Sequence, residues 1–154
     1  MNIHLICLGK LKESYWRDAE AEYLKRLSPY YKIHIHELKE VGFSEKDNPE
    51  NIKAKEAELI KEVLNKTKTE LVIALDQHGK QYSSEDLASF LADKNDIALI
   101  IGGPLGLHDS IMQLVKFKIS LSSLTFTHQM ARIILWEQIY RAKTIQIGKK
   151  YHYW

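Results

Sequence analysis

Cysteine is almost absent from this sequence, and long apolar runs are missing. Cys7 is the one cysteine among 154 residues, so no disulfide can form within the chain. Its apolar stretches, such as residues 97–101 and 133–136, are far shorter than the roughly 20 residues of a membrane-spanning helix. The opening residues also lack a signal-peptide cleavage site. We therefore expect a cytoplasmic protein with no membrane segment, in which Cys7 is a small core residue.

Several motifs of nucleotide-binding proteins, hydrolases and metal centres are missing as well. The glycine-rich turn at residues 102–106 lacks the G-x-G-x-x-G spacing and no Gly-Lys-Ser/Thr follows it, which disfavours dinucleotide and triphosphate sites. Neither a Gly-x-Ser-x-Gly elbow nor a paired-carboxylate signature is present. His34 and His36 share one face of a predicted strand, but no Cys or acidic residue has ligand spacing. The pattern favours a polar outer face over a zinc site, and we expect no metal.

The length and composition are those of one ordinary globular domain. The sequence is 45% hydrophobic and 27% charged, which is typical of a folded protein. A chain of this length buries one substantial core but is short for two domains with separate duties. We expect a single domain over residues 1–154.

Positive charge is concentrated in the C-terminal part of the chain. The net charge is +2 overall, but residues 128–154 contain five basic residues and one acidic residue, Glu137. This imbalance suits a phosphate-bearing partner, and a solvated basic tail is the alternative.

Strand-like runs alternate with stretches of helical spacing along the chain. Helices are predicted to start at Ser14, just after Asn48-Pro49, and at Ser83, where Ser83-x-x-Asp86 resembles a capping box. Continuous apolar strands indicate burial on both sheet faces. The sequence thus predicts a three-layer α/β fold, with helices on both faces of a mainly parallel sheet and a turn-rich surface loop at residues 40–49. The predicted strands are residues 3–8, 33–38, 71–75, 97–101 and 117–121.

The last predicted helix, at about residues 128–143, has more apolar surface than one face needs. Residues 133–136 are four consecutive apolar residues, which cover more than one side of a helix. One side is expected to meet the core. The other is covered either by the rest of the same chain or by a second copy of it.

Three predicted strands end in segments suited to a ligand. The segments are residues 75–79, the glycine turn at 102–106, and residues 121–126 with their hydroxyls and apolar side chains. In α/β folds ligands bind at the carboxyl ends of strands, and the third segment suits an adenine ring. A structural turn and an ordinary strand-to-helix connection are the alternatives for the second and third segments.

Several blocks spread over the chain form a recognisable pattern, of which the C-terminal part is the most specific. The blocks are Gly9-Lys10-Leu11-Lys12 with Tyr15-Trp16, Glu22-Tyr23, Ile101-Gly102-Gly103 with Gly106-Leu107, Thr125-Phe126, His128-Gln129-Met130, Arg132, Glu137-Gln138, Tyr140-Arg141-Ala142 and Tyr151-His152. Through these blocks, and across essentially its whole length, the sequence resembles the SPOUT-class methyltransferases of large-subunit ribosomal RNA that act at N3 of pseudouridine.

The resemblance implies a C-terminal trefoil knot, an S-adenosylmethionine pocket within it, and a homodimer in which the partner completes the active site. Connection rules alone argue against a knot, so this expectation depends on the resemblance. The implied cofactor residues coincide with the three strand ends. They are Leu75, Gly102, Leu121, Ser122, Ser123, Leu124, Thr125 and Phe126.

The implied substrate is a pseudouridine in the helix 69 loop of 23S ribosomal RNA, methylated on assembled ribosomes. Catalysis then requires alignment of the two reactants and loss of the N3 proton. We expect His128 or His152 to accept the proton, Arg132 and Arg141 to hold phosphate or the anion, and Tyr151 to stack on a base. A helical ion pair between Arg141 and Glu137 and a frayed terminus are the structural alternatives.

The sequence departs from the family pattern at two places. Thr127 replaces a proline that commonly precedes the His-Gln pair, and Tyr153-Trp154 replaces a basic residue after Tyr-His. Replacing the proline is expected to loosen the cofactor loop. The aromatic tail removes a possible phosphate contact and offers stacking surface instead. Rival functions are a non-catalytic ribosome-binding module, a transfer RNA methyltransferase of the same class and, least favoured, a nucleotide hydrolase.

Overall fold

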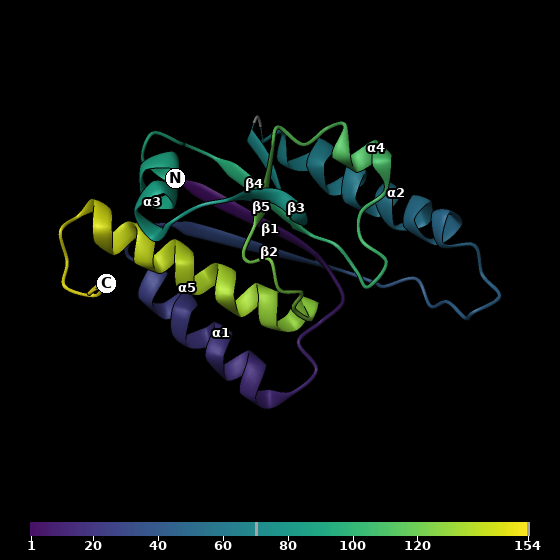
Figure 1. Ribbon diagram of the computed structural model, residues 1–154, viewed down its shortest axis with the longest axis horizontal. Helices are drawn as coiled ribbons and strands as arrows, with labels where there is room; N and C mark the ends of the chain where they lie inside the picture. Colours follow the sequence, from purple (N-terminus) through teal and green to yellow (C-terminus); the bar gives the residue numbers. More distant parts are fainter. Residues whose placement is uncertain (70, 154) are drawn as a thin grey trace.

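A computed structural model, which describes residues 1–69 and 71–153, has a five-stranded sheet between two layers of helices (Figure 1). The strand order is β2-β1-β4-β3-β5, and every pairing between these strands is parallel. The predicted three-layer α/β class is confirmed. The elements in chain order are β1 (Asn2–Leu8), α1 (Ser14–Leu27), β2 (Lys32–Leu38), α2 (Pro49–Thr67), β3 (Leu71–Gln81), α3 (Ser84–Ala92), β4 (Ile97–Ile101), α4 (Asp109–Met112), β5 (Phe117–Ser120) and α5 (His128–Gln146).

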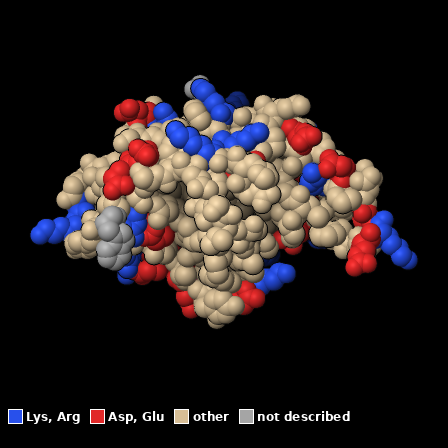
Figure 2. Space-filling model, in the orientation of Figure 1, with Lys and Arg blue, Asp and Glu red and all other residues tan. Residues whose placement is uncertain are grey.

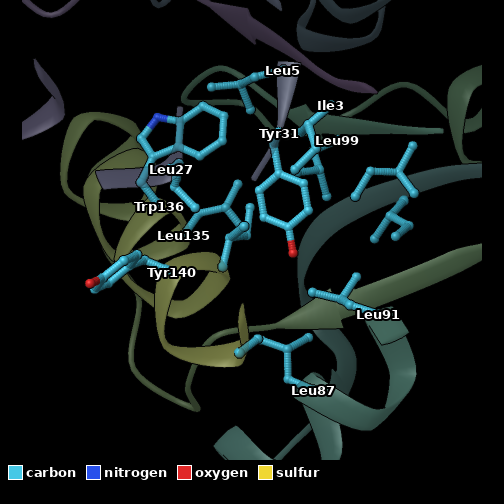
Figure 3. Packing of buried hydrophobic residues seen from close by; sticks show 14 of the residues in the cluster. Ile3, Leu5, Leu27, Tyr31, Leu87, Leu91, Leu99, Leu135, Trp136 and Tyr140 are labelled. Atoms are coloured by element: carbon cyan, nitrogen blue, oxygen red, sulfur yellow. The ribbon is translucent and has the colours of Figure 1, made fainter. Parts of the chain in front are cut away.

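Helices α1, α3 and α5 cover one face of the sheet, and α2 and α4 cover the other (Figure 1). Residues of β1 alternate between the two sides, with Leu5 and Cys7 facing the first group and Ile6 the second. Figure 3 shows Trp136 of α5 packed among side chains of the larger core. Cys7 is buried, and burial raises the pKa of its thiol to about 11, so the predicted core role of this cysteine is confirmed.

Side-chain caps mark the starts of α2 and α3, whereas α1 has none. Helix α1 begins at Ser14, as predicted. The side chain of Asn48 accepts a hydrogen bond from the main chain of Glu50 at 2.9 Å, and Ser83 accepts one from Asp86 at 3.0 Å. The predicted starts of α2 and α3 are therefore confirmed.

Strand β3 is longer than the sequence indicated, because polar residues continue it beyond Leu75. The register shifts between Leu75 and Lys80, after which Lys80 pairs with Ile119. A Cβ on Gly79 would lie 2.6 Å from the carbonyl carbon of Lys118, so this close crossing requires glycine. The extension bends β3 around the end of the sheet where the ligand segments were predicted.

Helix α5 lies against the sheet with one apolar side and leaves another partly open. Leu135 and Trp136 are buried, whereas Ile133 and Ile134 are half-buried. The predicted core-facing side is confirmed. The half-buried side leaves room for a second copy of the chain as its cover, which stays a prediction.

A buried ion pair joins α5 to α1. The Arg132 guanidinium donates to both carboxylate oxygens of Glu20, at 2.6 and 2.7 Å, and reaches Glu37 of β2 at 3.2 Å. The indole nitrogen of Trp136 also donates to Glu20, at 2.8 Å. Arg132 is 4% exposed, so its charge is matched almost wholly within the protein.

Three histidines meet on the α2 side of the sheet, near the β2 edge. His4 of β1 pairs in register with His34, and their rings stack at 4.6 Å between centroids. Nδ1 of His4 lies 3.1 Å from Nε2 of His36. Among the described residues, no group of three or more His, Cys, Asp or Glu side chains is arranged to hold a metal ion. The cluster is a set of stacked rings, and His4 is the member that the sequence pattern did not indicate.

This histidine cluster is expected to make folding less favourable in mild acid. Burial lowers the pKa of His4 and of His36, and the neighbouring His34 lowers both further, while Asp96 opposes the shift at His4. The unfolded chain then takes up protons at higher pH than the folded chain, so stability is greatest above pH ~6.5 and falls below it. Urea unfolding between pH 7.5 and 5 measures this slope. His36→Gln should make it shallower, and the exposed His78→Gln serves as the matched control; an equal slope in all three proteins would contradict the assignment.

Candidate cofactor pocket and C-terminal cluster

A pocket of about 650 Å³ lies where β4 and β5 end and β3 bends. This is the position at which open α/β sheets bind ligands. Ser123, one of the predicted cofactor residues, is exposed and does not line the pocket. The other predicted cofactor residues all line it. They are Leu75, Gly102, Leu121, Ser122, Leu124, Thr125 and Phe126.

The glycine turn after β4 forms one wall of the pocket and folds back tightly on itself. Gly106, with φ +80°, donates a main-chain hydrogen bond to Gly103 at 3.0 Å. A Cβ on Gly102 would lie 3.1 Å from the Leu107 side chain and 3.2 Å from the carbonyl carbon of Gly106. The wall has no room for a side chain at residue 102 without a shift of its neighbours. Because glycine has no side chain, a ligand can approach the backbone there.

The connection between β5 and α5 forms the opposite wall and keeps part of its main chain available. Ser122 holds this connection locally, because its carbonyl accepts from Ser120 at 2.8 Å and its hydroxyl accepts from the Leu124 main chain at 3.0 Å. Within the described parts of the chain, residues 122–126 make no backbone–backbone hydrogen bonds. Apart from the Ser122 carbonyl and the Leu124 N–H, the main-chain donors and acceptors of this segment are open to a ligand. Apolar walls with such groups suit an adenine ring, so the residues present fit S-adenosylmethionine.

Helix α5 places the first of the predicted catalytic residues at the pocket. His128, the first residue of α5, lines the pocket, and its Nε2 lies 3.5 Å from Oε1 of Glu40. The main chain of Lys12 donates to Gln129 at 2.8 Å, which ties the loop after β1 to the start of α5. Thr127 accepts a hydrogen bond from the Met130 main chain at 3.3 Å, so this departure from the family pattern caps the helix.

Arg141, Tyr151 and His152 come together in one cluster at the far end of α5. Arg141 forms an ion pair with Glu137, and Tyr151 donates to Glu137 at 3.1 Å. An Arg141 nitrogen lies 3.3 Å from Nδ1 of His152, whose Nε2 is 2.8 Å from Glu85. The tail is therefore folded against α5, and the predicted alternative of an Arg141–Glu137 pair is present. Burial raises the pKa of Tyr151, which keeps its hydroxyl protonated. Trp154, whose role was left open, lies outside the described residues.

The pocket and the C-terminal cluster are separated by most of the length of α5. A rise of about 1.5 Å per residue puts roughly 20 Å between His128 and Arg141 along the helix axis. Figure 1 shows the start of α5 and the C-terminal tail at opposite ends of this helix. The two groups of predicted residues therefore cannot meet within one copy of the chain.

Arg132 departs from the predicted site. Its guanidinium is buried and bonded to Glu20, so the structure gives it a structural role in place of the predicted contact with phosphate or an anion. Arg141 is also paired with a carboxylate. The basic C-terminal part is thus less open to phosphate than its sequence indicates, and Lys149 and Lys150 are its exposed cations.

Sequence reasoning gave no individual role to two side chains at this site. Asp76 lines the pocket from the bend of β3, and Glu40 approaches His128 from the loop after β2. Asp76 lies in the segment of residues 75–79 that was predicted to suit a ligand, so the sequence did indicate its position. Glu40 lies in a loop with no motif, so nothing local pointed to it.

Comparison with known proteins decides the family. Residues 1–152 match the family model described as "Predicted SPOUT methyltransferase". The chain belongs to the SPOUT methyltransferase family. This SPOUT methyltransferase is similar to the Ribosomal RNA large subunit methyltransferase H of Clostridium novyi (strain NT), with 45% identity over 163 aligned positions that cover 99% of each chain. The resemblance seen in the sequence is confirmed, while the trefoil knot that it implies stays a prediction.

The helices of this SPOUT methyltransferase are all too short or too polar to cross a membrane, as far as the described residues extend. The longest, α2 and α5, have 19 residues each and carry many charged side chains. Both helices pack on the sheet as parts of the two outer layers.

Proposed function

We propose that this protein is a cytoplasmic, S-adenosylmethionine-dependent methyltransferase that methylates N3 of a pseudouridine in the helix 69 loop of 23S ribosomal RNA, on assembled ribosomes. Family membership and the printed name of the Clostridium novyi relative support a ribosomal RNA substrate. The observation that carries the proposal is the pocket itself, because three segments far apart in sequence converge there as the resemblance implied.

The residues of the pocket would hold the cofactor, and His128 would act on the RNA base. When bound, S-adenosylmethionine supplies a methyl group activated by its positive sulfur. Leu75 and Phe126 offer apolar surface, and Gly102 leaves room for close approach. The main-chain groups of residues 125 and 126 would hydrogen-bond the ring edge. His128 accepts the N3 proton of the uracil-type ring, which leaves the nitrogen electron pair free to attack.

The remaining predicted residues would reach the pocket from a second copy of the chain. Arg141, Tyr151 and His152 lie at the end of α5 opposite the pocket, so a homodimer is the arrangement in which they join it. In the middle of the face shown in Figure 2, over the start of α5, few charged side chains are present. Leu124 is 71% exposed and Met130 39% exposed in this part of the chain. Apolar surface of this kind suits a symmetric interface between copies.

Transfer of labelled methyl groups tests the proposal. The purified protein is incubated with labelled S-adenosylmethionine and with ribosomes that lack the modification, and mass spectrometry locates the product. We expect label on the helix 69 pseudouridine, and no label on ribosomes that already carry the modification. Label on transfer RNA or on another ribosomal nucleotide would overturn the substrate. Cofactor binding without any transfer would favour a ribosome-binding module.

A further inference from the structure

Two polar atoms at the edge of the cofactor pocket are buried and make no hydrogen bond. They are Oε1 of Glu40 and Nε2 of His128. The two atoms lie 3.5 Å apart, just beyond a direct hydrogen bond. Buried polar atoms are normally paired, so this pair calls for a partner or a function. Hydrogen bonds at catalytic sites are often long before the substrate binds, and they tighten with it.

Three separate segments build the environment of this pair. Gly9, with φ +88°, presses its backbone against both side chains, and a Cβ there would collide with the Glu40 carboxylate and lie 3.3 Å from Nε2 of His128. The Gly9 main chain donates to Leu38 at 2.8 Å, which joins the loops after β1 and β2. The approach of Glu40 to His128 is therefore fixed by backbone contacts.

A second carboxyl group, that of Glu56, holds the loop that carries Glu40. Glu56 of α2 accepts a hydrogen bond from the Val41 main chain at 3.2 Å and thereby anchors the Glu40 loop. Burial raises the pKa of Glu56, the Val41 hydrogen bond lowers it, and the charge of Glu40 raises it further.

We propose that Glu40 is a positioning residue that fixes the ring of His128 for proton transfer. With its N–H on Nε2 directed at Glu40, the ring has a free electron pair on Nδ1, which makes no hydrogen bond with any described residue and is not one of the buried atoms. His128 lines the pocket, so Nδ1 is the nitrogen available there. This inference rests on the proposed function.

The proton step balances without any further reactant. The N3–H bond of the base breaks, its electron pair stays on N3, and the proton forms a bond to Nδ1 of His128. The resulting imidazolium lies at the first residue of α5, where the helix dipole disfavours positive charge. The carboxylate of Glu40 offsets this cost, and the proton passes to water after the base has been methylated.

Glu40→Gln tests the proposal, because it keeps the shape of the side chain and removes its charge. We expect the single-turnover rate of methyl transfer to fall about 10- to 100-fold, with unchanged cofactor affinity and unchanged KM for ribosomes. Glu40→Asp should recover part of the rate. The deficit should shrink as the pH rises toward the range where N3 ionises on its own. Glu45→Gln, in the same exposed loop, is the matched control and should behave like the unchanged protein.

Nitrogen NMR of the His128 ring gives a readout that does not depend on activity. The unchanged protein should show the Nε2–H tautomer, assigned by its loss in His128→Asn, and Glu40→Gln should convert it to a mixture. Equal rates and the same tautomer in Glu40→Gln would overturn the inference. If the unchanged protein transfers no methyl group, the proposed function fails and the proton step fails with it. The tautomer would still decide whether Glu40 orients the ring.

Discussion

Replacing Gly102 with tryptophan is expected to abolish binding of S-adenosylmethionine while leaving the fold intact. Even a Cβ at this position would lie 3.1 to 3.2 Å from Leu107 and Gly106, so the indole ring is expected to occupy the pocket volume. Gly102 follows β4 in a surface turn, so the sheet and both cores keep their packing. We expect cofactor affinity, measured by calorimetry, to fall at least about 100-fold, because a ligand cannot share the volume that a large side chain fills.

Gly42→Trp is the control for this substitution. Gly42 has open space around its Cβ position and an unstrained φ, so the same residue is added without a clash. It should bind the cofactor normally. Unchanged affinity in Gly102→Trp, with a correctly folded protein, would contradict the assignment of the pocket.

Breaking the buried pair between Glu20 and Arg132 is expected to destabilise the protein strongly. Glu20→Gln leaves the Arg132 charge buried with only Glu37 to balance it, and it also weakens the hydrogen bond from Trp136. The free energy of unfolding should fall by about 3–5 kcal/mol, as for other buried pairs that lose one partner. Urea unfolding followed by circular dichroism measures this loss.

A surface pair on the same helix provides the comparison. Glu22 and Arg26 form an ion pair in which both side chains are about half exposed. Glu22→Gln should cost far less than Glu20→Gln, because solvent screens the charges. Similar losses in the free energy of unfolding for Glu20→Gln and Glu22→Gln would show that the Arg132 pair contributes no more to stability than a surface pair.

The parts of the fold that local chemistry determines were predictable from the sequence. Asn48 and Ser83 cap helices through hydrogen bonds to residues two or three positions away, so their signals lie within a few residues. The end of β3 was not predictable, because its polar residues resemble a loop and are held as a strand only by pairing with β5. Tertiary pairing overrode the local pattern there.

The candidate site also has residues that were predictable from the sequence and residues that were not. Gly102 and the segment after β5 follow strand ends, and Leu75 ends the apolar part of β3. Parallel strands bring these points together, so they were predictable. The role of Arg132 was not, because its carboxylate partner Glu20 is 112 positions away in the sequence. Glu40 was missed for the same reason, since only the folded chain brings it to His128.

Complementation between two inactive variants tests the central claim, that methyl transfer occurs at a site shared by two copies of the chain. One variant carries Gly102→Trp and keeps its tail, and the other lacks residues 151–154 and keeps its pocket. Each alone should be inactive on ribosomes that lack the modification, although the truncated variant should still bind the cofactor. After unfolding and refolding together in equal amounts, half of the dimers contain one copy of each variant.

In such a mixed dimer, one of the two shared sites has both an intact pocket and an intact tail. The account therefore predicts that the mixture recovers about a quarter of the methyl transfer of the unchanged protein, with the label on the same pseudouridine, if random pairing holds. A mixture as inactive as its components would contradict the shared site. Full activity of the truncated variant alone would show that the tail takes no part in the reaction.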